Sequence, residues 1–281
     1  MSLLTINKLT TSVGAEVRGV DPERLGADDG VGDAILDALE DNGVLVFRDL
    51  GIDPQAQVAF CRRLGQVDHS SDGHHRVPGI YPITLDTSKN ASAAYLRATF
   101  AWHIDGCTPL GEECPQKATV LSALRPADRG GETEFASAYA AYDALTEQEQ
   151  RRYPQLRVVH SLEASQRRVT PDPSPEELAR WRSRPTHEHP LVWTHRSGRR
   201  SLVLGASADH IVGMDLDEGR ALLAELLQRA TTPEKVYSHH WSKGDMVIWD
   251  NRGVLHRAAP YAPDSPREML RTTVLGDEPI Q

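Results

Sequence analysis

The chain has 281 residues, of which 39% are hydrophobic and 25% are charged, a composition typical of a soluble globular protein rather than of a disordered or membrane-embedded one. Asp and Glu together number 40 and Lys and Arg 31, which leaves a formal net charge of −9. Because an acidic chain repels the phosphate backbone, we expect no general binding to nucleic acids.

The N-terminal third of the chain predicts a mixture of helices and strands. Apolar side chains at helical spacing predict a helix over residues 31–42, and Gly43 follows where the end of a helix favours glycine. Asp53 and Pro54 fit the N-cap and first turn of a second helix, which we expect to end near Gly65. Strands are expected at residues 14–20, 44–47 and 80–86, and a mobile loop of small polar residues at 88–94.

From residue 102 onwards, short strands recur with helices between them. Ser174 precedes a proline and two glutamates, which is typical of a helix N-terminus with acidic residues at its positive end. Leucines at helical spacing predict another helix over residues 216–227. Many short strands with turn signals favour a β-barrel or sandwich. The strands are expected at residues 117–124, 156–162, 191–194, 201–204, 236–241, 246–249 and 271–275.

The chain shows no sign of a second domain, of export or of a membrane segment. No repeat, low-complexity tract or linker divides it, so we expect one domain over residues 1–281. Its longest clear apolar run, residues 44–47, is far too short to cross a bilayer. The start lacks a basic stretch followed by an apolar segment, which favours the cytoplasm. Cys61, Cys107 and Cys114 lack zinc-site spacing and fit reduced thiols.

The tetrapeptide Trp102-His103-Ile104-Asp105 is the first signal of a metal site. On a strand, side chains two residues apart point to the same face, so His103 and Asp105 can hold one ion while Ile104 turns into the core. Far downstream, His256 falls just past a turn that follows a predicted strand. Two imidazoles and one carboxylate form the facial triad of non-haem Fe(II) oxygenases, which leaves adjacent positions open for a co-substrate and O₂.

A His-X-Asp spacing alone is weak evidence for a metal, because it arises by chance in many chains and this one has 12 histidines. Two arginines downstream of His256 strengthen it. Arg267 and Arg271 each carry a planar guanidinium, which suits bidentate binding of a carboxylate. The alternative is a solvated basic face, since arginine is usually exposed. Against this alternative, Arg271 enters a predicted strand, where its side chain can face the interior.

Taken in order, these motifs resemble the taurine dioxygenase and 2,4-dichlorophenoxyacetate dioxygenase family of Fe(II)/2-oxoglutarate-dependent oxygenases. Residues 132–145 are more similar to the aryloxyalkanoate branch than to the taurine branch. The resemblance implies an α+β fold with a double-stranded β-helix, or jelly roll, as its core, together with flanking helices and lid loops. It covers nearly the whole chain and rests on residues 14–20, 102–105, 130–135, 244–252 and 256–258, followed by Arg267 and Arg271.

The resemblance also assigns roles to individual residues. It implies that His103, Asp105 and His256 bind Fe(II). It implies further that 2-oxoglutarate chelates this iron, while its far carboxylate pairs with Arg267 and hydrogen-bonds Thr133. The expected cofactor is therefore Fe(II), and the expected co-substrates are 2-oxoglutarate and O₂. In the family, the arginine matched by Arg271 holds the anionic group of the substrate.

The reaction implied by the resemblance is the hydroxylation of a C–H bond, coupled to decarboxylation of 2-oxoglutarate to succinate and CO₂. The implied partner is a small anionic molecule such as an aryloxyalkanoate, a sulfonate or an alkyl sulfate. Two alternatives stay open. The same iron can support desaturation or epoxidation in a biosynthetic pathway, or the jelly roll can bind a small acid without turnover.

Weaker signals concern the substrate side of the site. In the taurine branch a histidine after the second helix meets the sulfonate, and His69, His74 and His75 lie in that stretch, although a solvated loop histidine is the alternative for each. Thr99 precedes the Trp-His motif, near the position where several family members carry a polar residue. We therefore keep His69 and Thr99 as candidate substrate-binding residues. Residues 66–101 and 163–190 are expected to form the lid, and a homo-oligomer is expected from base rates.

Overall fold

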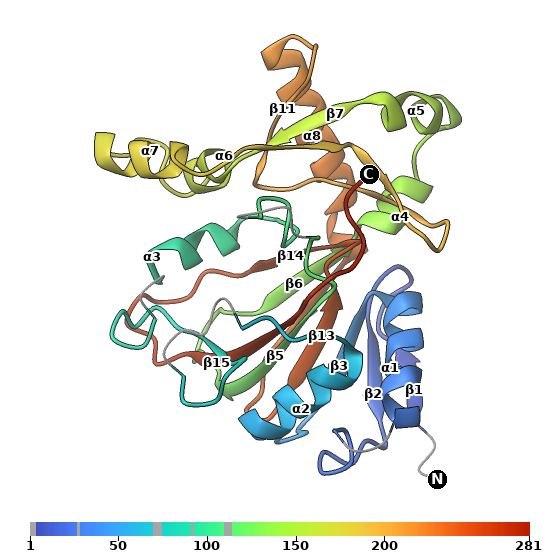
Figure 1. Cartoon of the computed structure of the whole chain (residues 1–281), viewed down its shortest axis with the longest axis vertical. Helices are drawn as coiled ribbons and strands as arrows, with labels where there is room; N and C mark the ends of the chain where they lie inside the picture. Colours follow the sequence, from blue (N-terminus) through green and yellow to red (C-terminus); the bar gives the residue numbers. More distant parts are fainter. Residues whose placement is uncertain (1–3, 27–28, 70–74, 91–92, 110–113) are drawn as a thin grey trace.

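Two β-sheets form the centre of the structure, a computed structural model that describes residues 4–26, 29–69, 75–90, 93–109 and 114–281 (Figure 1). Within the described residues the larger sheet has seven strands, in the order β1-β2-β3-β13-β5-β15-β4, and a smaller sheet has the order β12-β6-β14. The strands of the larger sheet are β1 Thr5–Lys8, β2 Ala15–Arg18, β3 Val44–Phe47, β13 Met246–Asp250, β5 Ala118–Arg125, β15 Glu268–Val274 and β4 Tyr81–Ile83. Those of the smaller sheet are β12 Val236–His239, β6 Thr133–Ser137 and β14 Val254–Ala258.

The core of the molecule follows from the alternation of side chains along these strands. Val46 and Trp249 point to one face of the larger sheet and pack with Phe135 of the smaller sheet in one buried cluster. Leu45 and Ile248, their neighbours in the chain, point to the other face and belong to a second cluster. A sheet that is apolar on both faces is covered on both sides. The two facing sheets form the jelly roll expected from the sequence.

Two helices cover the outer face of the larger sheet, α1 Asp29–Asn42 and α2 Pro54–Leu64 (Figure 1). The predicted cap of α2 is present: the side chain of Asp53 accepts a hydrogen bond from the backbone N of Ala56 at 2.7 Å. Such a cap satisfies a backbone donor that the first turn leaves without a partner. Both helices therefore begin and end close to where the sequence predicts them.

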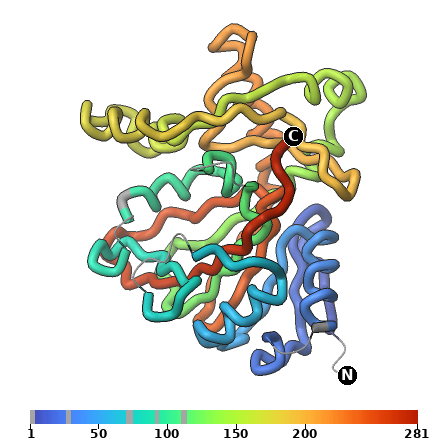
Figure 2. The backbone as a smooth tube through the Cα atoms, viewed as in Figure 1, coloured from blue at the N-terminus to red at the C-terminus, as the bar shows by residue number. Residues whose placement is uncertain are grey.

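A second layer, residues 138–230, lies above the two sheets in Figure 1. The C-terminal segment reaches this layer (Figure 2), where the backbone N of Arg196 donates to Glu278 Oε1 at 2.6 Å. The strands of the layer are β7 Arg157–His160, β8 His187–Pro190, β9 Val192–Thr194, β10 Arg200–Leu202 and β11 Ala208–Ile211. Its helices are α4 Ala138–Asp143, α5 Glu147–Arg152, α6 Leu162–Arg167, α7 Pro175–Arg182 and α8 Leu216–Ala230. The other helices that the structure describes are α3 Ala93–Leu96 and the 3₁₀ turns η1 Arg97–Phe100, η2 Tyr153–Gln155 and η3 Pro233–Lys235.

Several predicted strands are shorter than expected, among them those over residues 14–20 and 236–241, which cover only β2 and β12. The strand predicted over residues 156–162 ends at His160, because the hydroxyl of Ser161 accepts a hydrogen bond from the backbone N of Ala164 at 3.0 Å and so caps α6. The strand predicted over residues 80–86 covers only β4.

Strands β1, β6, β8, β11 and β14 were not predicted as strands. The sequence of β8, His-Glu-His-Pro, lacks an apolar face because β8 is an edge strand that pairs only with β7.

The expected loop at residues 88–94 is tied to the sheet where it is described. Asn90 is buried, and its side chain accepts a hydrogen bond from the Tyr81 hydroxyl at 2.8 Å and donates one to the Pro82 carbonyl at 3.1 Å. These bonds hold Asn90 against β4. The composition of the loop predicted mobility, whereas this part of it is fixed to the sheet. Residues 91–92 lie outside the described residues, and α3 follows from Ala93.

None of the helices in the described part of the chain is long and apolar enough to cross a bilayer.

The buried carboxylate of Asp245, in the turn before β13, is held by several donors. It accepts hydrogen bonds from the backbone N of Asp49 and of Ser242, each at 3.1 Å, and pairs with Arg48 at 2.9 Å and His239 at 3.2 Å. Burial opposes its ionisation. The contact with His239 and the hydrogen bonds from the two backbone donors outweigh burial and lower the pKa of Asp245 to about 2.

We expect Asp245→Asn to lower the free energy of unfolding at pH 7 by roughly 2 kcal/mol, the linkage equivalent of a shift from 3.8 to about 2. The folded-state pKa lies below the unfolded value, so this stabilisation is fully present above pH ~4 and is lost between pH ~4 and ~2. Urea unfolding of both proteins across that range measures the difference. A difference that stays constant down to pH ~2 would contradict the assignment.

Candidate metal centre

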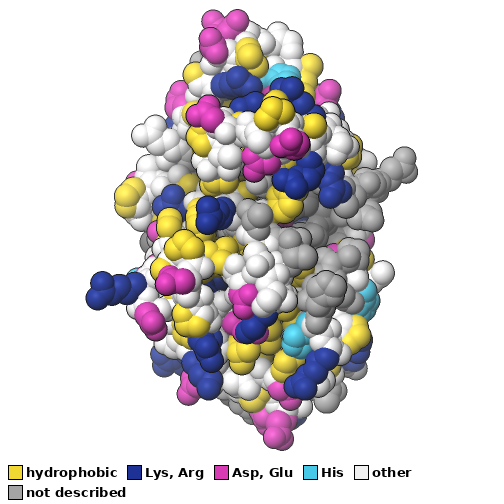
Figure 3. Space-filling model, turned by 90° about the vertical axis from the view of Figure 1, so that its left-hand side faces the viewer, with side chains coloured by type: hydrophobic (Ala, Val, Ile, Leu, Met, Phe, Trp, Pro, Cys, Tyr) yellow, Lys and Arg dark blue, Asp and Glu magenta, His cyan; other side chains and the backbone are white. Residues whose placement is uncertain are grey.

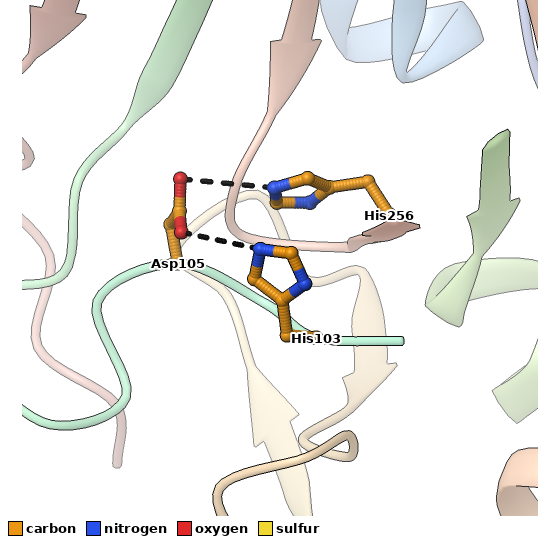
Figure 4. A group of neighbouring side chains, drawn as sticks. All are labelled: His103, Asp105 and His256. Atoms are coloured by element: carbon orange, nitrogen blue, oxygen red, sulfur yellow. Dashed lines mark ion pairs between the residues drawn. The ribbon is translucent and has the colours of Figure 1, made fainter. Parts of the chain in front are cut away.

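Three side chains from two distant parts of the chain converge on one point (Figure 4). The two carboxylate oxygens of Asp105 face Nε2 of His103 and Nε2 of His256, each at 3.7 Å. The ligand atoms of the three residues all lie within 4.8 Å of one another. Two atoms bound to one ion at about 2.1 Å are at most ~4.2 Å apart, so a single first-row metal ion fits between the carboxylate and each imidazole with little movement.

The backbone brings the two histidines together through a single pair of reciprocal hydrogen bonds. The backbone N of His103 donates to the carbonyl of His256 at 3.0 Å, and the reverse bond is 2.9 Å long. The imidazole rings lie 4.2 Å apart between centroids. His256 lies on β14, but His103 makes only an isolated bridge, so the expectation that residues 102–105 form a strand was wrong. Ile104 is buried as predicted and joins Trp102 in the apolar cluster of the second layer.

The contacts of the two Nδ1 atoms determine which nitrogen of each imidazole carries a hydrogen. Nδ1 of His103 lies 2.9 Å from the carbonyl of Ala101, and Nδ1 of His256 lies 3.4 Å from the carbonyl of Val254. A carbonyl oxygen only accepts hydrogen bonds, so each Nδ1 carries the hydrogen and each Nε2 directs its lone pair towards Asp105. Both histidines are thus arranged as neutral ligands.

Burial sets the charge state of these groups. It lowers the pKa of His256 to about 3, although the negative charge of Asp105 acts in the opposite direction. For Asp105, burial acts to raise the pKa. The interactions of Asp105 with His256, His103, Arg271 and Thr119 together outweigh burial, so its pKa stays below the usual value. An ionised carboxylate beside a neutral imidazole is the state that binds a divalent cation.

A cavity lies beside the three side chains and includes most of the residues that the sequence singled out. Its polar lining is Thr99, Thr133, Arg257, Arg267 and Arg271, and its apolar lining includes Ile83, Leu96, Leu121, Trp249 and Tyr261. The first expected lid segment, residues 66–101, therefore contributes to the cavity wall. Among the described residues of the second, 163–190, none lines it.

Of the histidines expected on the substrate side, the two that the structure describes are not brought to this cavity. His69 is exposed and does not line it. Nδ1 of His75 accepts a hydrogen bond from the backbone N of Val77 at 3.1 Å, and His75 is also not part of the lining. His74 lies outside the described residues. Of the proposed substrate-binding residues, the structure places Thr99 and Arg271 beside the three side chains and leaves His69 away from them.

Arg267 is a buried cation for which the described part of the chain supplies no counter-ion. It is 2% exposed and forms no ion pair with a described carboxylate, and its Nε has no hydrogen-bond partner in the described part of the chain. Its guanidinium lies 4.9 Å from the ring centroid of Tyr261. Burial lowers the pKa of Arg267, but a guanidinium stays charged at neutral pH. Because a buried charge is costly unless it is paired, the side chain is suited to an incoming anion.

Thr133 has a free hydroxyl hydrogen beside Arg267. The indole Nε1 of Trp241 donates to Thr133 Oγ1 at 2.9 Å. An indole N–H only donates, so the Thr133 oxygen is the acceptor and its single hydrogen stays available for a ligand in the cavity. Trp241 was expected only as the end of a strand. No local pattern marks its role, because its partner lies on β6, far away in the chain.

Comparison with known proteins decides the family. A family model described as "Taurine catabolism dioxygenase TauD, TfdA family" matches residues 5–273. The chain belongs to this family. An alpha-ketoglutarate-dependent 2,4-dichlorophenoxyacetate dioxygenase of Burkholderia sp. (strain RASC) is 37% identical over 85% of this chain and 83% of that protein. An alpha-ketoglutarate-dependent sulfate ester dioxygenase of Pseudomonas putida is 32% identical over 99% of this chain and 91% of that protein.

Solved structures agree with this membership. The crystal structure of AAD-2 in complex with Mn(II) and N-oxalylglycine superimposes with a TM-score of 0.84 at 33% identity, covering 99% of this chain and 100% of that one. A taurine dioxygenase from Burkholderia xenovorans gives 0.78 at 30% identity, covering 98% and 92%. This TauD/TfdA dioxygenase is therefore an oxidoreductase that uses Fe(II), 2-oxoglutarate and O₂, and its α+β jelly-roll fold is confirmed.

We expect Trp241→Phe to raise the KM for 2-oxoglutarate about two- to tenfold, the range of one neutral hydrogen bond. Without the indole donor, the Thr133 hydroxyl is free to turn away from the cavity. Steady-state succinate assays measure the change. In a Thr133→Val background the same Trp241 substitution should have little further effect, and two independent, additive effects would contradict the link between the two residues.

Proposed function

We propose that His103, Asp105 and His256 hold the Fe(II) of this dioxygenase, and that Arg267 and Thr133 bind the far carboxylate of 2-oxoglutarate. One observation carries the proposal. Three side chains able to ligate a metal, with atoms within 4.8 Å of one another, line the same cavity as a buried guanidinium that has no counter-ion among the described residues. Such a cavity offers one cation site and one anion site side by side, which is what a metal-chelating dicarboxylate needs.

The chain itself positions the reactants and excludes water. When bound, iron and 2-oxoglutarate supply the oxidation of a C–H bond, with release of succinate and CO₂. The protein keeps the His256 imidazole in place by packing it against Trp249, at 4.9 Å between ring centroids, and against Phe135, at 6.5 Å. The Arg267 guanidinium and the Thr133 hydroxyl fix one end of the co-substrate, so its other end meets the metal in a constant orientation.

For the substrate, we propose a small acid with an apolar body. Arg271 supplies the cationic group: its Nε has no hydrogen-bond partner among the described residues, and its guanidinium lies 4.9 Å from the ring centroid of Tyr81. The apolar side chains of the cavity wall suit an aryl or alkyl group. Relatives named as 2,4-dichlorophenoxyacetate, (S)-phenoxypropionate and sulfate ester dioxygenases fit this chemistry.

The Thr99 hydroxyl and the Asp105 carboxylate limit which substrates the cavity can bind. Thr99 donates its hydroxyl hydrogen to the carbonyl of Leu96 at 2.6 Å, so it has no hydrogen left for an anion and we assign it to the cavity wall. Among the described lining residues, only Asp105 is a carboxylate. A substrate ammonium, such as that of taurine, would compete for this proposed metal ligand. We therefore propose that aryloxyalkanoates or alkyl sulfates are preferred to taurine.

A substrate screen tests the proposal. The protein is loaded anaerobically with Fe(II) and 2-oxoglutarate, mixed with aryloxyacids, sulfate esters or taurine, and exposed to O₂. We expect succinate together with a product that has gained oxygen or has been cleaved, and more of it with aryloxyacids or sulfate esters than with taurine. A product that has lost two hydrogens would indicate desaturation. No succinate with any acid would favour a binding protein.

Several broader features remain proposals. We propose one domain over residues 1–281, because the larger sheet joins β1 near the start of the chain to β15 near its end. All three cysteines are free, which supports a reducing compartment and hence the cytoplasm. Acidic and basic side chains are interspersed over the face in Figure 3, in keeping with no nucleic-acid partner. A homo-oligomer is testable by light scattering.

A further inference from the structure

Strand β5 directs a fully buried threonine towards the proposed metal centre. Thr119 lies opposite Trp249 of β13 and Thr273 of β15. Residues directly opposite each other in a sheet point to the same face, and Trp249 lines the cavity. The Thr119 side chain therefore lies on the cavity face of the sheet, within reach of the carboxylate of Asp105, whose pKa it helps to lower.

A second buried side chain determines which way the hydroxyl hydrogen of Thr119 can point. Asn251, in the turn between β13 and β14, donates from Nδ2 to Thr119 Oγ1 at 2.8 Å, and both residues are 0% exposed. Its backbone N donates to the carbonyl of Lys117 at 3.0 Å, which ties the turn to the start of β5. Because the amide N–H can only donate, the Thr119 oxygen accepts. Its single hydrogen then remains for Asp105.

The opposite orientation of the Asn251 amide is unfavourable beside a metal ligand. Its Oδ1 has no hydrogen-bond partner within the described residues. If the amide were reversed, this oxygen would take the hydrogen of Thr119, and a lone pair of Thr119 would face the carboxylate of Asp105. A carboxylate that binds a cation is ionised and needs donors, not acceptors, at its free positions. The chain Asn251–Thr119–Asp105 therefore has one consistent direction of donation.

We propose that Thr119 and Asn251 are positioning residues that hold the carboxylate of Asp105 in its metal-binding orientation. This inference rests on the proposed function, in which Asp105 is an iron ligand. Asn251 lies on the turn that leads directly into β14 and His256. The segment from Asn251 to His256 thus carries one proposed metal ligand, His256. It also carries the side chain that supports the other, Asp105, whose carboxylate lies 3.7 Å from His256. Hydrogen-bond partners of metal ligands typically contribute 10- to 100-fold in metal affinity.

Calorimetric titration of the metal-free protein with Mn(II) alone tests the proposal. We expect Thr119→Val, which removes the hydroxyl and keeps the shape, to weaken Mn(II) binding about 10- to 100-fold. Thr119→Ser restores the donor and should restore most of the affinity. Asn251→Asp should weaken binding as well, because its carboxylate only accepts and draws the Thr119 hydrogen away. Thr273→Val is the matched control, the same change directly across the sheet, and should bind Mn(II) like the wild type.

The outcomes separate this inference from the proposed metal site. Thr119→Val with wild-type affinity, or Thr273→Val weakened as much as Thr119→Val, would overturn the positioning role. A wild type that binds no Mn(II), or Asp105→Ala with wild-type affinity, would instead overturn the metal site itself. Unfolding midpoints of the metal-free variants show that each is folded. If Thr119→Val does not fold, wild-type affinity in Asn251→Asp is the result that overturns the proposal.

Discussion

Asp105→Ala is expected to abolish succinate formation and to weaken Mn(II) binding by more than ~100-fold, beyond the 10- to 100-fold range of a residue that acts through a ligand. The physical reason is charge. Asp105 is the only carboxylate of the proposed triad, and the other two members are neutral imidazoles. Without it, the cation would lie beside the guanidinium of Arg271 with no negative charge from the described residues of the cavity lining.

Mn(II) titration and a succinate assay with the best substrate of the screen measure this effect. The metal-free variant should unfold at nearly the wild-type midpoint, because Asp105 faces a cavity rather than the apolar core. Asp172→Ala, which changes an exposed aspartate between α6 and α7, is the control and should leave both measurements unchanged. Wild-type turnover in Asp105→Ala would remove Asp105 from the set of ligands.

The second large effect is expected for Arg267→Met, which should raise the KM for 2-oxoglutarate about 10- to 100-fold. A hydrogen-bonded pair with a charged group is worth about 1.5–3 kcal/mol, and each 1.4 kcal/mol corresponds to a factor of ten. Without co-substrate, the buried guanidinium has no counter-ion among the described residues. The ligand-free variant should therefore be at least as stable as the wild type, since methionine fills much of the same space without a charge.

Two measurements together test the role of Arg267. Steady-state assays give the KM for 2-oxoglutarate, and thermal unfolding with and without 2-oxoglutarate gives the stabilisation by the ligand, which the variant should largely lose. Arg271→Met is the matched control: it should raise the KM of the acidic substrate and leave that of 2-oxoglutarate nearly unchanged. An unchanged 2-oxoglutarate requirement in Arg267→Met would reassign this arginine.

Local sequence signals predicted much of this structure. The caps of α2 and α7, at Asp53 and Ser174, satisfy backbone donors within the next few residues, so the pattern is complete within a short window. The apolar runs of β3 and β13 are also local, because strands buried on both faces need apolar residues at every position. Strand β8 escaped prediction because an edge strand with partly exposed residues carries no such pattern.

The sequence by itself determined which side chains are available to the proposed site: His103, Asp105 and His256 as candidate metal ligands, and the two arginines that follow them. Only the tertiary structure decided which of the other polar side chains reach that site. In the folded chain His69 lies away from the cavity. The indole of Trp241 donates a hydrogen bond to Thr133, and the amide of Asn251 donates one to Thr119. The reason is physical: such contacts depend on the register of strands that are far apart in the chain, and no short segment specifies that register alone.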